Sequence, residues 1–326
     1  MSVNLKGRNF LTLKDFLPDE IDHLLALSLK LKQDKMSGIR SRNLEGKNIA
    51  LIFEKPSTRT RCAFVVACND EGAHAEYLGK NDIQLAKKES VKDTARVLGR
   101  MFDGIQFRGF SHRTAEELAA FAGVPVWNGL TDKFHPTQVL ADFMTVTECL
   151  GGLKGIKMAY VGDGSNNVAN SLMIGGAKMG LDFRIVTHES LFPDPGLLAE
   201  VREMAPACGA RITCTSNIDE GVDGIDVIYT DVWASMGDEE RLPERIGMLK
   251  QYQVNEKMIE RTGNPNVIFL HCLPSFHGRD TEISARFPDV CEVTDEVFEH
   301  PRSKVFDQAE NRVHTIKAVM VATIGK

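Results

Sequence analysis

Short apolar runs rich in β-branched residues alternate with segments of helical periodicity, and this alternation occurs twice along the 326-residue chain. Such alternation predicts βαβ units, in which helices join parallel strands. In the first half we expect strands at 48–53, 74–78, 104–107 and 124–127, and helices near 60–70, 90–101 and 114–122. In the second half we expect strands at 157–161, 183–186, 211–215, 227–230 and 267–270, and helices near 167–179, 195–205 and 254–261. The predicted fold class is α/β, with two doubly wound parallel-sheet domains.

The domain boundary is expected where the amphipathic segment 136–150 runs into the glycine pair 151–152. This gives a first domain over 1–150 and a second over 151–306. The tail 307–326 has a helical pattern and no strand after it, so we expect it to pack back on the first domain. Two such domains joined by helices would form a cleft, and ligands bind at the carboxyl ends of parallel strands. The active site is therefore expected in that cleft.

Composition excludes several classes of protein. With 39 Lys and Arg against 45 Asp and Glu, the net charge is −6, and no basic stripe indicates a nucleic-acid partner. No run approaches the roughly 18 apolar residues of a membrane span, and the N-terminal residues do not resemble a targeting segment. The seven cysteines are scattered and form no C-x-x-C pair, which favours reduced thiols over disulfides or structural zinc. We therefore expect a cytoplasmic protein.

The segment 53–61, FEKPSTRTR, follows the first expected strand and opens a helix. Ser57, Thr58 and Thr60 supply hydroxyls, and Arg59 supplies a planar guanidinium that matches phosphate oxygens. The free N–H groups of the helix start add a positive field. The combination predicts a site for phosphate or a similar oxyanion. The alternative is an ordinary capped first turn with solvated arginines. For Arg61, we expect a structural role and not a ligand contact.

A second group of candidates lies later in the first half. The segment His135-Pro136-Thr137-Gln138 opens the helix expected between the domains, which places His135 and Gln138 beside the cleft. A neutral histidine there can donate to a developing oxyanion, although capping and packed histidines share this pattern. Arg108 ends the strand 104–107, and strand carboxyl ends face the cleft.

Three segments of the second half carry further candidates. The turn 162–167, GDGSNN, resembles a dinucleotide fingerprint but has Asn167 where the last glycine is required. It suits a carboxylate or amino ligand, or capping by Asn166. Asp231 follows the strand 227–230 and could bind an amine or cap a turn. The strand 267–270 runs into His271-Cys272-Leu273-Pro274, where the proline leaves carbonyls available to a ligand, while a buried inert thiol is the other interpretation of Cys272.

Taken in order, S-T-R-T-R after the first strand and H-P-T-Q at the interdomain helix resemble the carbamoyltransferase family, over essentially all 326 residues. The motifs D-x-x-x-S-M-G at 231–237 and H-C-L-P at 271–274 resemble the ornithine branch of that family, whereas the aspartate branch lacks both. The resemblance implies reversible transfer of the carbamoyl group from carbamoyl phosphate to the δ-amine of L-ornithine. The products are L-citrulline and phosphate, in arginine biosynthesis or the arginine dihydrolase pathway, and no cofactor or metal is required.

The resemblance also implies roles for single residues. The catalytic residues would be Arg108, His135, Asp231 and Cys272. Carbamoyl phosphate would be bound by Ser57, Thr58, Arg59, Thr60, Gln84, Arg108, His135, Gln138, Cys272, Leu273 and Arg312. Ornithine would be bound by Asn167, Asp231, Ser235 and Met236, with the choice between Asn166 and Asn167 open. Gln84 matches a glutamine that a neighbouring subunit contributes, which implies a homotrimer with shared active sites. The family's Leu–Pro bond at 273–274 is typically cis.

Other functions stay open at this point. A carbamoyltransferase for another amine such as putrescine would need a second domain that does not recognise an α-amino acid, and the S-M-G motif speaks against it. A dinucleotide-dependent dehydrogenase is disfavoured by the incomplete fingerprint. A non-catalytic binding protein is disfavoured because every motif is intact. The sequence does not decide between synthesis and breakdown of citrulline, or whether trimers assemble further. We also expect 231–250 to be a mobile loop that acts as a lid.

Overall fold

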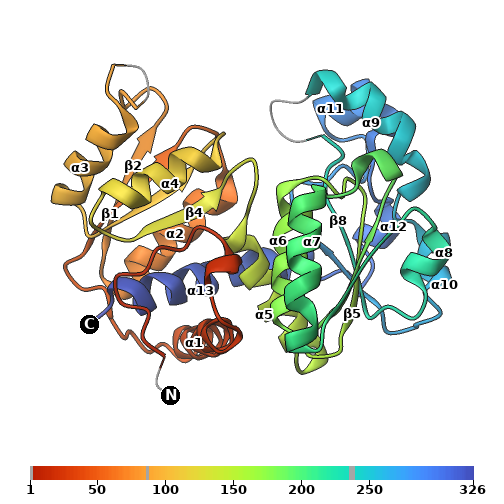
Figure 1. Ribbon diagram of the computed structural model, residues 1–326, viewed down its shortest axis with the longest axis horizontal. Helices are drawn as coiled ribbons and strands as arrows, with labels where there is room; N and C mark the ends of the chain where they lie inside the picture. The colour runs from red at the N-terminus through yellow and green to blue at the C-terminus, as the bar shows by residue number, and fades with distance from the viewer. Residues whose placement is uncertain (1–2, 86–87, 235–238) are drawn as a thin grey trace. The chain divides into compact units, whose positions relative to one another are not determined.

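The computed structural model of the protein describes residues 3–85, 88–234 and 239–326 (Figure 1). The chain forms two compact units. Unit 1 comprises Met1–Met144 and Glu310–Lys326, and unit 2 comprises Thr145–Ala309. The divisions fall inside two helices, α5 (Pro136–Leu150) and α13 (Val305–Ile324), so each of these helices has residues in both units. Within the described ranges, no helix is long and apolar enough to cross a membrane.

Unit 1 contains a four-stranded parallel sheet in the order β2-β1-β3-β4. Its strands are β1 (Asn48–Phe53), β2 (His74–Gly79), β3 (Gly104–Arg108) and β4 (Val126–Leu130). Its helices, besides parts of α5 and α13, are α1 (Pro18–Met36), α2 (Thr58–Glu71), α3 (Val91–Met101) and α4 (His112–Phe121). The chain proceeds outward from β1 to β2 and then crosses to β3 on the other side. The direction in which the chain adds strands therefore reverses between β1 and β3, which is the topological switch point of the sheet.

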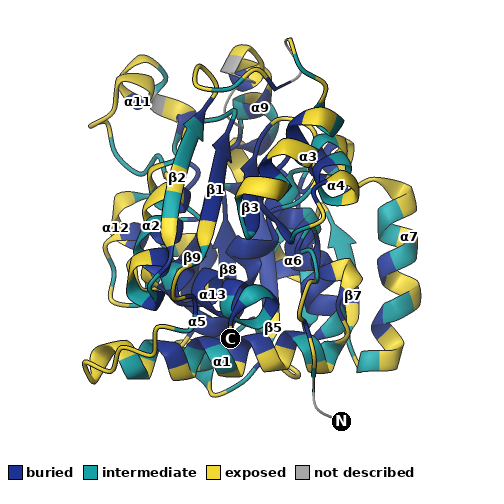
Figure 2. Ribbon diagram, turned by 90° about the vertical axis from the view of Figure 1, so that its left-hand side faces the viewer, coloured by how far each residue is buried: buried dark blue, intermediate teal, exposed yellow. Residues whose placement is uncertain are grey.

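Helices cover both faces of this sheet, which is why β1 is a continuous apolar run (Figure 2). On one face, Ala50 and Ile52 belong to a buried cluster that includes side chains of α3 and α4. On the other face, the ring of Trp127 stacks on Phe64 of α2, and its Nε1 donates to Thr323 of α13 at 3.1 Å. A Cβ on Gly104 would lie 2.2 Å from the Trp127 ring, so this position of β3 has room only for glycine.

Unit 2 contains a five-stranded parallel sheet in the order β7-β6-β5-β8-β9. Its strands are β5 (Lys157–Val161), β6 (Asp182–Val186), β7 (Arg211–Thr215), β8 (Val227–Thr230) and β9 (Ile268–His271). Its helices are α6 (Asn167–Lys178), α7 (Pro195–Met204), α8 (Ile218–Val222), α9 (Leu242–Leu249), α10 (Glu256–Arg261), α11 (Glu282–Arg286) and α12 (Asp295–Phe298). The switch point of this sheet lies between β5 and β8. The predicted α/β class with two doubly wound parallel sheets is confirmed.

Three differences from the sequence-based expectations have physical reasons. β4 begins at Val126 and not at 124, because the preceding Pro125 has no N–H, and it continues through Asn128 and Gly129, which have the composition of a turn. α1 was not among the expected elements, because it precedes the first strand and so lies outside the βαβ alternation. The prediction that 231–250 is a loop is wrong for its second half. The helix α9 occupies Leu242–Leu249, and its residues Leu242 and Leu249 are buried.

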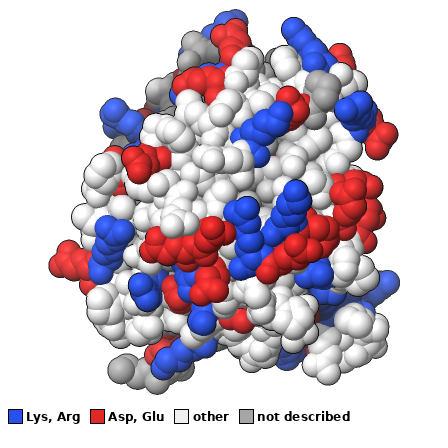
Figure 3. Space-filling model, turned by 90° about the vertical axis from the view of Figure 1, so that its right-hand side faces the viewer, with Lys and Arg blue, Asp and Glu red and all other residues white. Residues whose placement is uncertain are grey.

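Charges of both signs are mixed on the surface. On the face drawn in Figure 3, Lys and Arg side chains alternate with Asp and Glu, and no single-sign stripe crosses it. All seven cysteines lie in the described ranges and are free thiols there.

Candidate functional site

The candidate residues follow strands at or next to the switch point of each sheet. In unit 1, α2 begins after β1, and Arg108 is the last residue of β3. In unit 2, the turn before α6 follows β5, Asp231 follows β8, and Cys272 follows β9. Because a switch point leaves a crevice at the carboxyl ends of the strands, each unit has a candidate half-site where ligands bind in α/β folds.

The start of α2 is built to receive an anion. Ser57 is the N-cap, with extended backbone, and its hydroxyl accepts a hydrogen bond from the N–H of Thr60 at 3.2 Å. Thr58 and Arg59 occupy the first helical positions, where backbone N–H groups lack helical acceptors. Thr58 is exposed and Arg59 is half-buried. Arg61 instead lies over the ring of Tyr77 at 3.8 Å, a structural contact.

Thr60 brings two arginines together. Its buried Oγ1 accepts a hydrogen bond from Nη2 of Arg312 at 2.9 Å and a longer one from Nη1 of Arg108 at 3.5 Å. Arg108 is 5% exposed and Arg312 is 2% exposed. Arg312 is 252 positions from Thr60 in the sequence and reaches unit 1 through α13. Burying two guanidinium groups side by side is costly unless an anion offsets their charge.

His135 lies in the field of these arginines. It is 3% exposed, and burial lowers the pKa of its ring well below the ordinary value, with further lowering by Arg312, Arg108 and Arg59. The imidazole is therefore neutral near pH 7. The buried side chain of Gln138 lies one turn further along α5 and donates from Nε2 to Asp142 at 2.8 Å. Gln84, by contrast, is exposed on the segment after β2.

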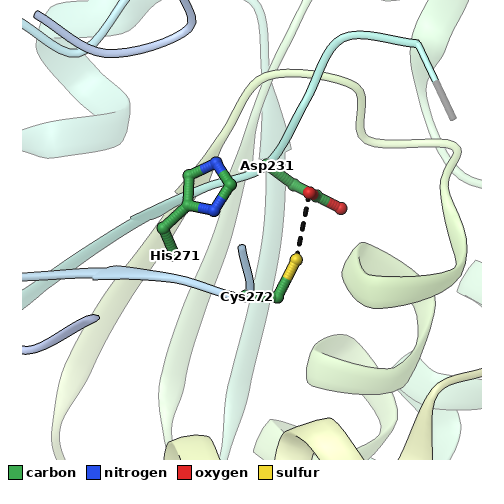
Figure 4. A group of neighbouring side chains, drawn as sticks. All are labelled: Asp231, His271 and Cys272. Carbon is green, nitrogen blue, oxygen red and sulfur yellow. Dashed lines mark hydrogen bonds between the residues drawn. The ribbon is translucent and has the colours of Figure 1, made fainter. Parts of the chain in front are cut away.

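In unit 2, Asp231 and Cys272 form a direct pair (Figure 4). The Cys272 thiol donates to Oδ1 of Asp231 at 3.0 Å, and the backbone N–H of Val232 donates to the same oxygen at 2.8 Å. The other oxygen, Oδ2, accepts from Nδ2 of Asn166 at 3.2 Å. Asp231 is 7% exposed, and burial raises the pKa of its carboxyl above the usual value.

The two asparagines of the turn have different surroundings. Asn166 is the N-cap of α6, because its Oδ1 accepts from the N–H of Ala169 at 2.8 Å. Its Nδ2 donates to Tyr160 as well as to Asp231, so both ends of this amide hold parts of the protein. Asn167 is the first residue of α6 and is half-buried. Ser235 and Met236 lie outside the described residues.

The segment after β9 is held by a buried pair that the sequence did not reveal. His271 and Glu292 are both 0% exposed, and Nε2 of the ring lies 3.0 Å from Oε1 of Glu292. The N–H of Leu273 donates to Nδ1 of His271 at 2.8 Å, so Nδ1 carries no proton and Nε2–H donates to Glu292. The same Oε1 accepts from Ser275 and from the N–H of Phe276, each at 2.8 Å. Leu273 takes a left-handed conformation with φ 58°, and the Leu273–Pro274 bond is cis.

His271 and Glu292 differ in how far the sequence could have indicated them. His271 belongs to the H-C-L-P motif, and its position before Cys272 could have marked it. Glu292 lies between Cys291 and Val293 with no local pattern, and only the tertiary fold brings it to His271.

Two groups of side chains in the described ranges have metal-ligand composition. In the group Asp231, His271 and Cys272, both ring nitrogens of His271 already have hydrogen bonds, so the ring is not available to an ion. In the group His277, Asp295 and Glu299, Nδ1 of His277 pairs with Asp295 at 2.7 Å and the ring stacks on Phe298. Its two carboxylates are exposed to solvent, as in an ordinary surface ion pair. We assign a metal to neither group.

Family models match both halves of the chain. The family model described as "Aspartate/ornithine carbamoyltransferase, carbamoyl-P binding domain" matches residues 8–148. The model described as "Aspartate/ornithine carbamoyltransferase, Asp/Orn binding domain" matches residues 154–323.

Individual relatives match over the whole chain. The chain is 61% identical to a catabolic ornithine carbamoyltransferase of Bacillus licheniformis, over 99% of this chain and 98% of the relative. It is 56% identical to an ornithine carbamoyltransferase of Streptococcus uberis, over 100% of this chain and 98% of the relative. Among solved structures, the ornithine carbamoyltransferase of Pyrococcus furiosus superposes with a TM-score of 0.92 at 44% identity, covering 99% of each chain. The chain belongs to the aspartate/ornithine carbamoyltransferase family.

Proposed function

We propose that this protein transfers the carbamoyl group of carbamoyl phosphate to the δ-amine of L-ornithine, giving L-citrulline and phosphate. The observation that carries the proposal is the presence in one chain of two complementary half-sites at switch points. One is a buried cluster of arginines at a helix start, and the other is a buried carboxylate paired with a thiol. The names of the most similar relatives support ornithine as the acceptor.

Unit 1 is proposed to hold carbamoyl phosphate. The phosphate would accept hydrogen bonds from the N–H groups and hydroxyls at Ser57, Thr58 and Thr60, and from the guanidinium groups of Arg59 and Arg108. These are the charged groups that a leaving phosphate needs. Arg312, held against Thr60, would contact the carbamoyl oxygen together with His135, and Gln138 would hold the carbamoyl amide.

The neutral state of His135 suits it to act as a hydrogen-bond donor. Burial and the neighbouring arginines lower its pKa, so it does not add a competing positive charge or titrate near pH 7. A neutral imidazole N–H can still donate to the carbonyl oxygen as negative charge develops there. Removal of one such donor typically costs about 3 kcal/mol of transition-state stabilisation.

Unit 2 is proposed to hold ornithine. Asp231 and Cys272 would receive the δ-amine, and Asn167, Ser235 and Met236 would bind the amino-acid end. Asn166 is better suited to orienting Asp231, since both ends of its amide already bond to the protein. The carbonyls of Cys272 and Leu273 would accept from the carbamoyl NH₂, because the left-handed Leu273 turns the backbone out of the sheet.

The chemistry is acyl transfer. The neutral δ-amine attacks the carbonyl carbon, a C–N bond forms, and the tetrahedral oxyanion collapses with cleavage of the C–O bond to phosphate. The attacking nitrogen loses a proton, and a free alkyl amine has a pKa near 10.4, so the site must favour the neutral amine. The raised pKa of Asp231 makes it a stronger base than an ordinary carboxylate, which suits it to accept that proton.

The proposal also covers the oligomeric state, the location and the direction of the reaction in the cell. Gln84 is exposed, as expected of a side chain that serves a neighbouring subunit, and we propose a homotrimer with shared active sites in the cytoplasm. Several of the most similar relatives are named catabolic, which favours citrulline breakdown in the arginine dihydrolase pathway as the direction in the cell.

An acceptor panel tests the proposal. Purified protein is given carbamoyl phosphate with ornithine, putrescine or aspartate in parallel, and carbamoylated product is measured. We expect turnover with ornithine only. Turnover with putrescine or aspartate instead would contradict the acceptor assignment, and no turnover with any of them would contradict the proposed activity.

A further inference from the structure

An ion pair between Arg245 of α9 and Asp163 of the β5–α6 turn lies next to the candidate ornithine residues but has no part in the function proposed above. Nη2 of Arg245 lies 3.4 Å from Oδ2 of Asp163, and each side chain is 10% exposed. Surface ion pairs are common and contribute little, whereas a pair removed from water must be offset by good partners. Its burial indicates a specific role.

Asp163 shapes the turn that carries the two asparagines. Its Oδ1 accepts from the N–H of Ser165 at 3.0 Å and from the Ser165 hydroxyl at 2.6 Å. The turn begins at Gly162, whose φ of 138° is rarely adopted by other residues. Three residues after Asp163, Asn166 caps the N-terminus of α6 and donates to Asp231. A shift of Asp163 would therefore be passed to the carboxylate that is proposed to meet the amine.

Arg245 also compensates the charge of Asp163. Asp163 and Asp231 are each 7% exposed, and a buried carboxylate is unfavourable unless a cation or hydrogen bonds offset its charge. Asp231 accepts hydrogen bonds from Asn166, Cys272 and the N–H of Val232. Arg245 supplies a cation to Asp163.

The described residues satisfy only part of this guanidinium. Within the ranges that the structure describes, Nη1 of Arg245 is buried and has no hydrogen-bond partner. Keeping an unsatisfied donor inside the fold is unfavourable, so a residue needed only for packing would be better replaced by an apolar one. The feature that justifies arginine here is its charge beside Asp163.

We propose that Arg245 is a positioning residue for ornithine. It acts through Asp163 on the turn that carries Asn166 and Asn167, and Asn166 in turn donates to Asp231. The inference rests on the proposed function. Arg245 does not contact the reacting atoms in this account; it fixes the turn and neutralises Asp163, so its loss changes ornithine binding and leaves the carbamoyl phosphate half-site unchanged.

The test compares steady-state kinetics of the wild type with R245Q, R245K, D163N and the double variant D163N/R245Q. We expect R245Q to raise KM for ornithine tenfold or more while KM for carbamoyl phosphate stays within twofold. R245K keeps the charge without the planar fork and should restore part of the affinity. The double variant removes both charges, so its KM for ornithine should be well below the product of the two single effects.

Arg241 provides the matched control. It is an exposed arginine four residues earlier, paired with Glu244 at 3.6 Å, and R241Q should leave both KM values unchanged. Equal changes in both KM values, additive single effects, or an unchanged KM for ornithine in R245Q would overturn the inference. If R245Q does not fold, the KM values of R245K and of the near-isosteric D163N for ornithine and carbamoyl phosphate provide the same test. Absence of turnover in the wild type would instead count against the proposed function itself.

Discussion

At the scale of single residues, one hydroxyl organises the half-site that we propose for carbamoyl phosphate. Thr60 accepts hydrogen bonds from Arg312 and Arg108, two buried arginines that arrive from distant parts of the chain. The S-T-R-T-R and H-P-T-Q motifs predict which residues of the first half take part, because those residues are close in sequence. The reach of Arg312 and the support of Glu292 could be assigned only from family resemblance or from the fold, since no local pattern encodes a contact across 252 or 21 positions.

The variant T60V tests that organisation. Valine has nearly the same shape but accepts no hydrogen bond, so the two arginines lose their shared acceptor. We expect KM for carbamoyl phosphate to rise about tenfold, in line with about 1.4 kcal/mol for a lost hydrogen bond to a charged group. T213V, a partly buried threonine of β7 in the other unit, is the control and should not change KM. An unchanged KM in T60V would mean that the arginines are held by other contacts.

At the scale of elements, the sequence predicts strands more accurately than helices. Buried parallel strands are continuous apolar runs, so β1, β5 and β8 have the expected bounds. The partly exposed edge strand β7 also has the expected bounds, because its β-branched residues favour a strand. The observed strand β4 (Val126–Leu130) ends later than the expected strand 124–127, because the polar pair Asn128-Gly129 has the composition of a turn. α9 was missed because it contains Pro243 and Gly247, which are typical of loops, and because its buried face is a short set that includes Arg245. Side chains whose burial depends on distant partners are not apparent from periodicity.

The cap of α2 gives a prediction at this scale. S57A removes the acceptor for the Thr60 N–H and should lower the free energy of unfolding by about 1 kcal/mol. N255A removes the equivalent cap of α10, where Asn255 accepts from Met258, and should cost a similar amount. Only S57A should also raise KM for carbamoyl phosphate. Denaturant unfolding gives the change in stability, and steady-state kinetics give KM for carbamoyl phosphate. Equal KM values for carbamoyl phosphate in the two variants would show that the α2 cap serves stability alone.

At the scale of the whole molecule, both units repeat one architecture, and each places its candidate residues at the switch point of its own sheet. From the sequence, the candidate residues were expected at the carboxyl ends of parallel strands, and the strand order that defines each switch point comes from the structure. The buried ionisable groups that the fold creates away from these sites were not predictable, because they depend on which helices meet. His314 of α13 is one of them.

His314 makes stability depend on pH. Burial lowers its pKa to about 4, and Lys317, Lys32 and Lys35 contribute to the lowering. The unfolded chain takes up this proton near pH 6.5 and the folded chain only near pH 4, so folding stability falls as pH decreases through this interval. The loss at pH 5 should be about 2 kcal/mol. Urea unfolding at pH 7.5 and pH 5 should show a smaller decrease for H314Q than for the wild type, whereas H23Q, at an exposed position of α1, should behave as the wild type. Equal decreases in all three proteins would contradict the assignment.

The most direct test of the account follows the carbamoyl carbon itself. Carbamoyl phosphate labelled with ¹³C at the carbonyl is mixed with ornithine and the wild-type protein, and the label and released phosphate are measured together by NMR. Each phosphate released should correspond to one labelled citrulline. Phosphate release without labelled citrulline would show hydrolysis in place of transfer and would contradict the pairing of the two half-sites in one reaction.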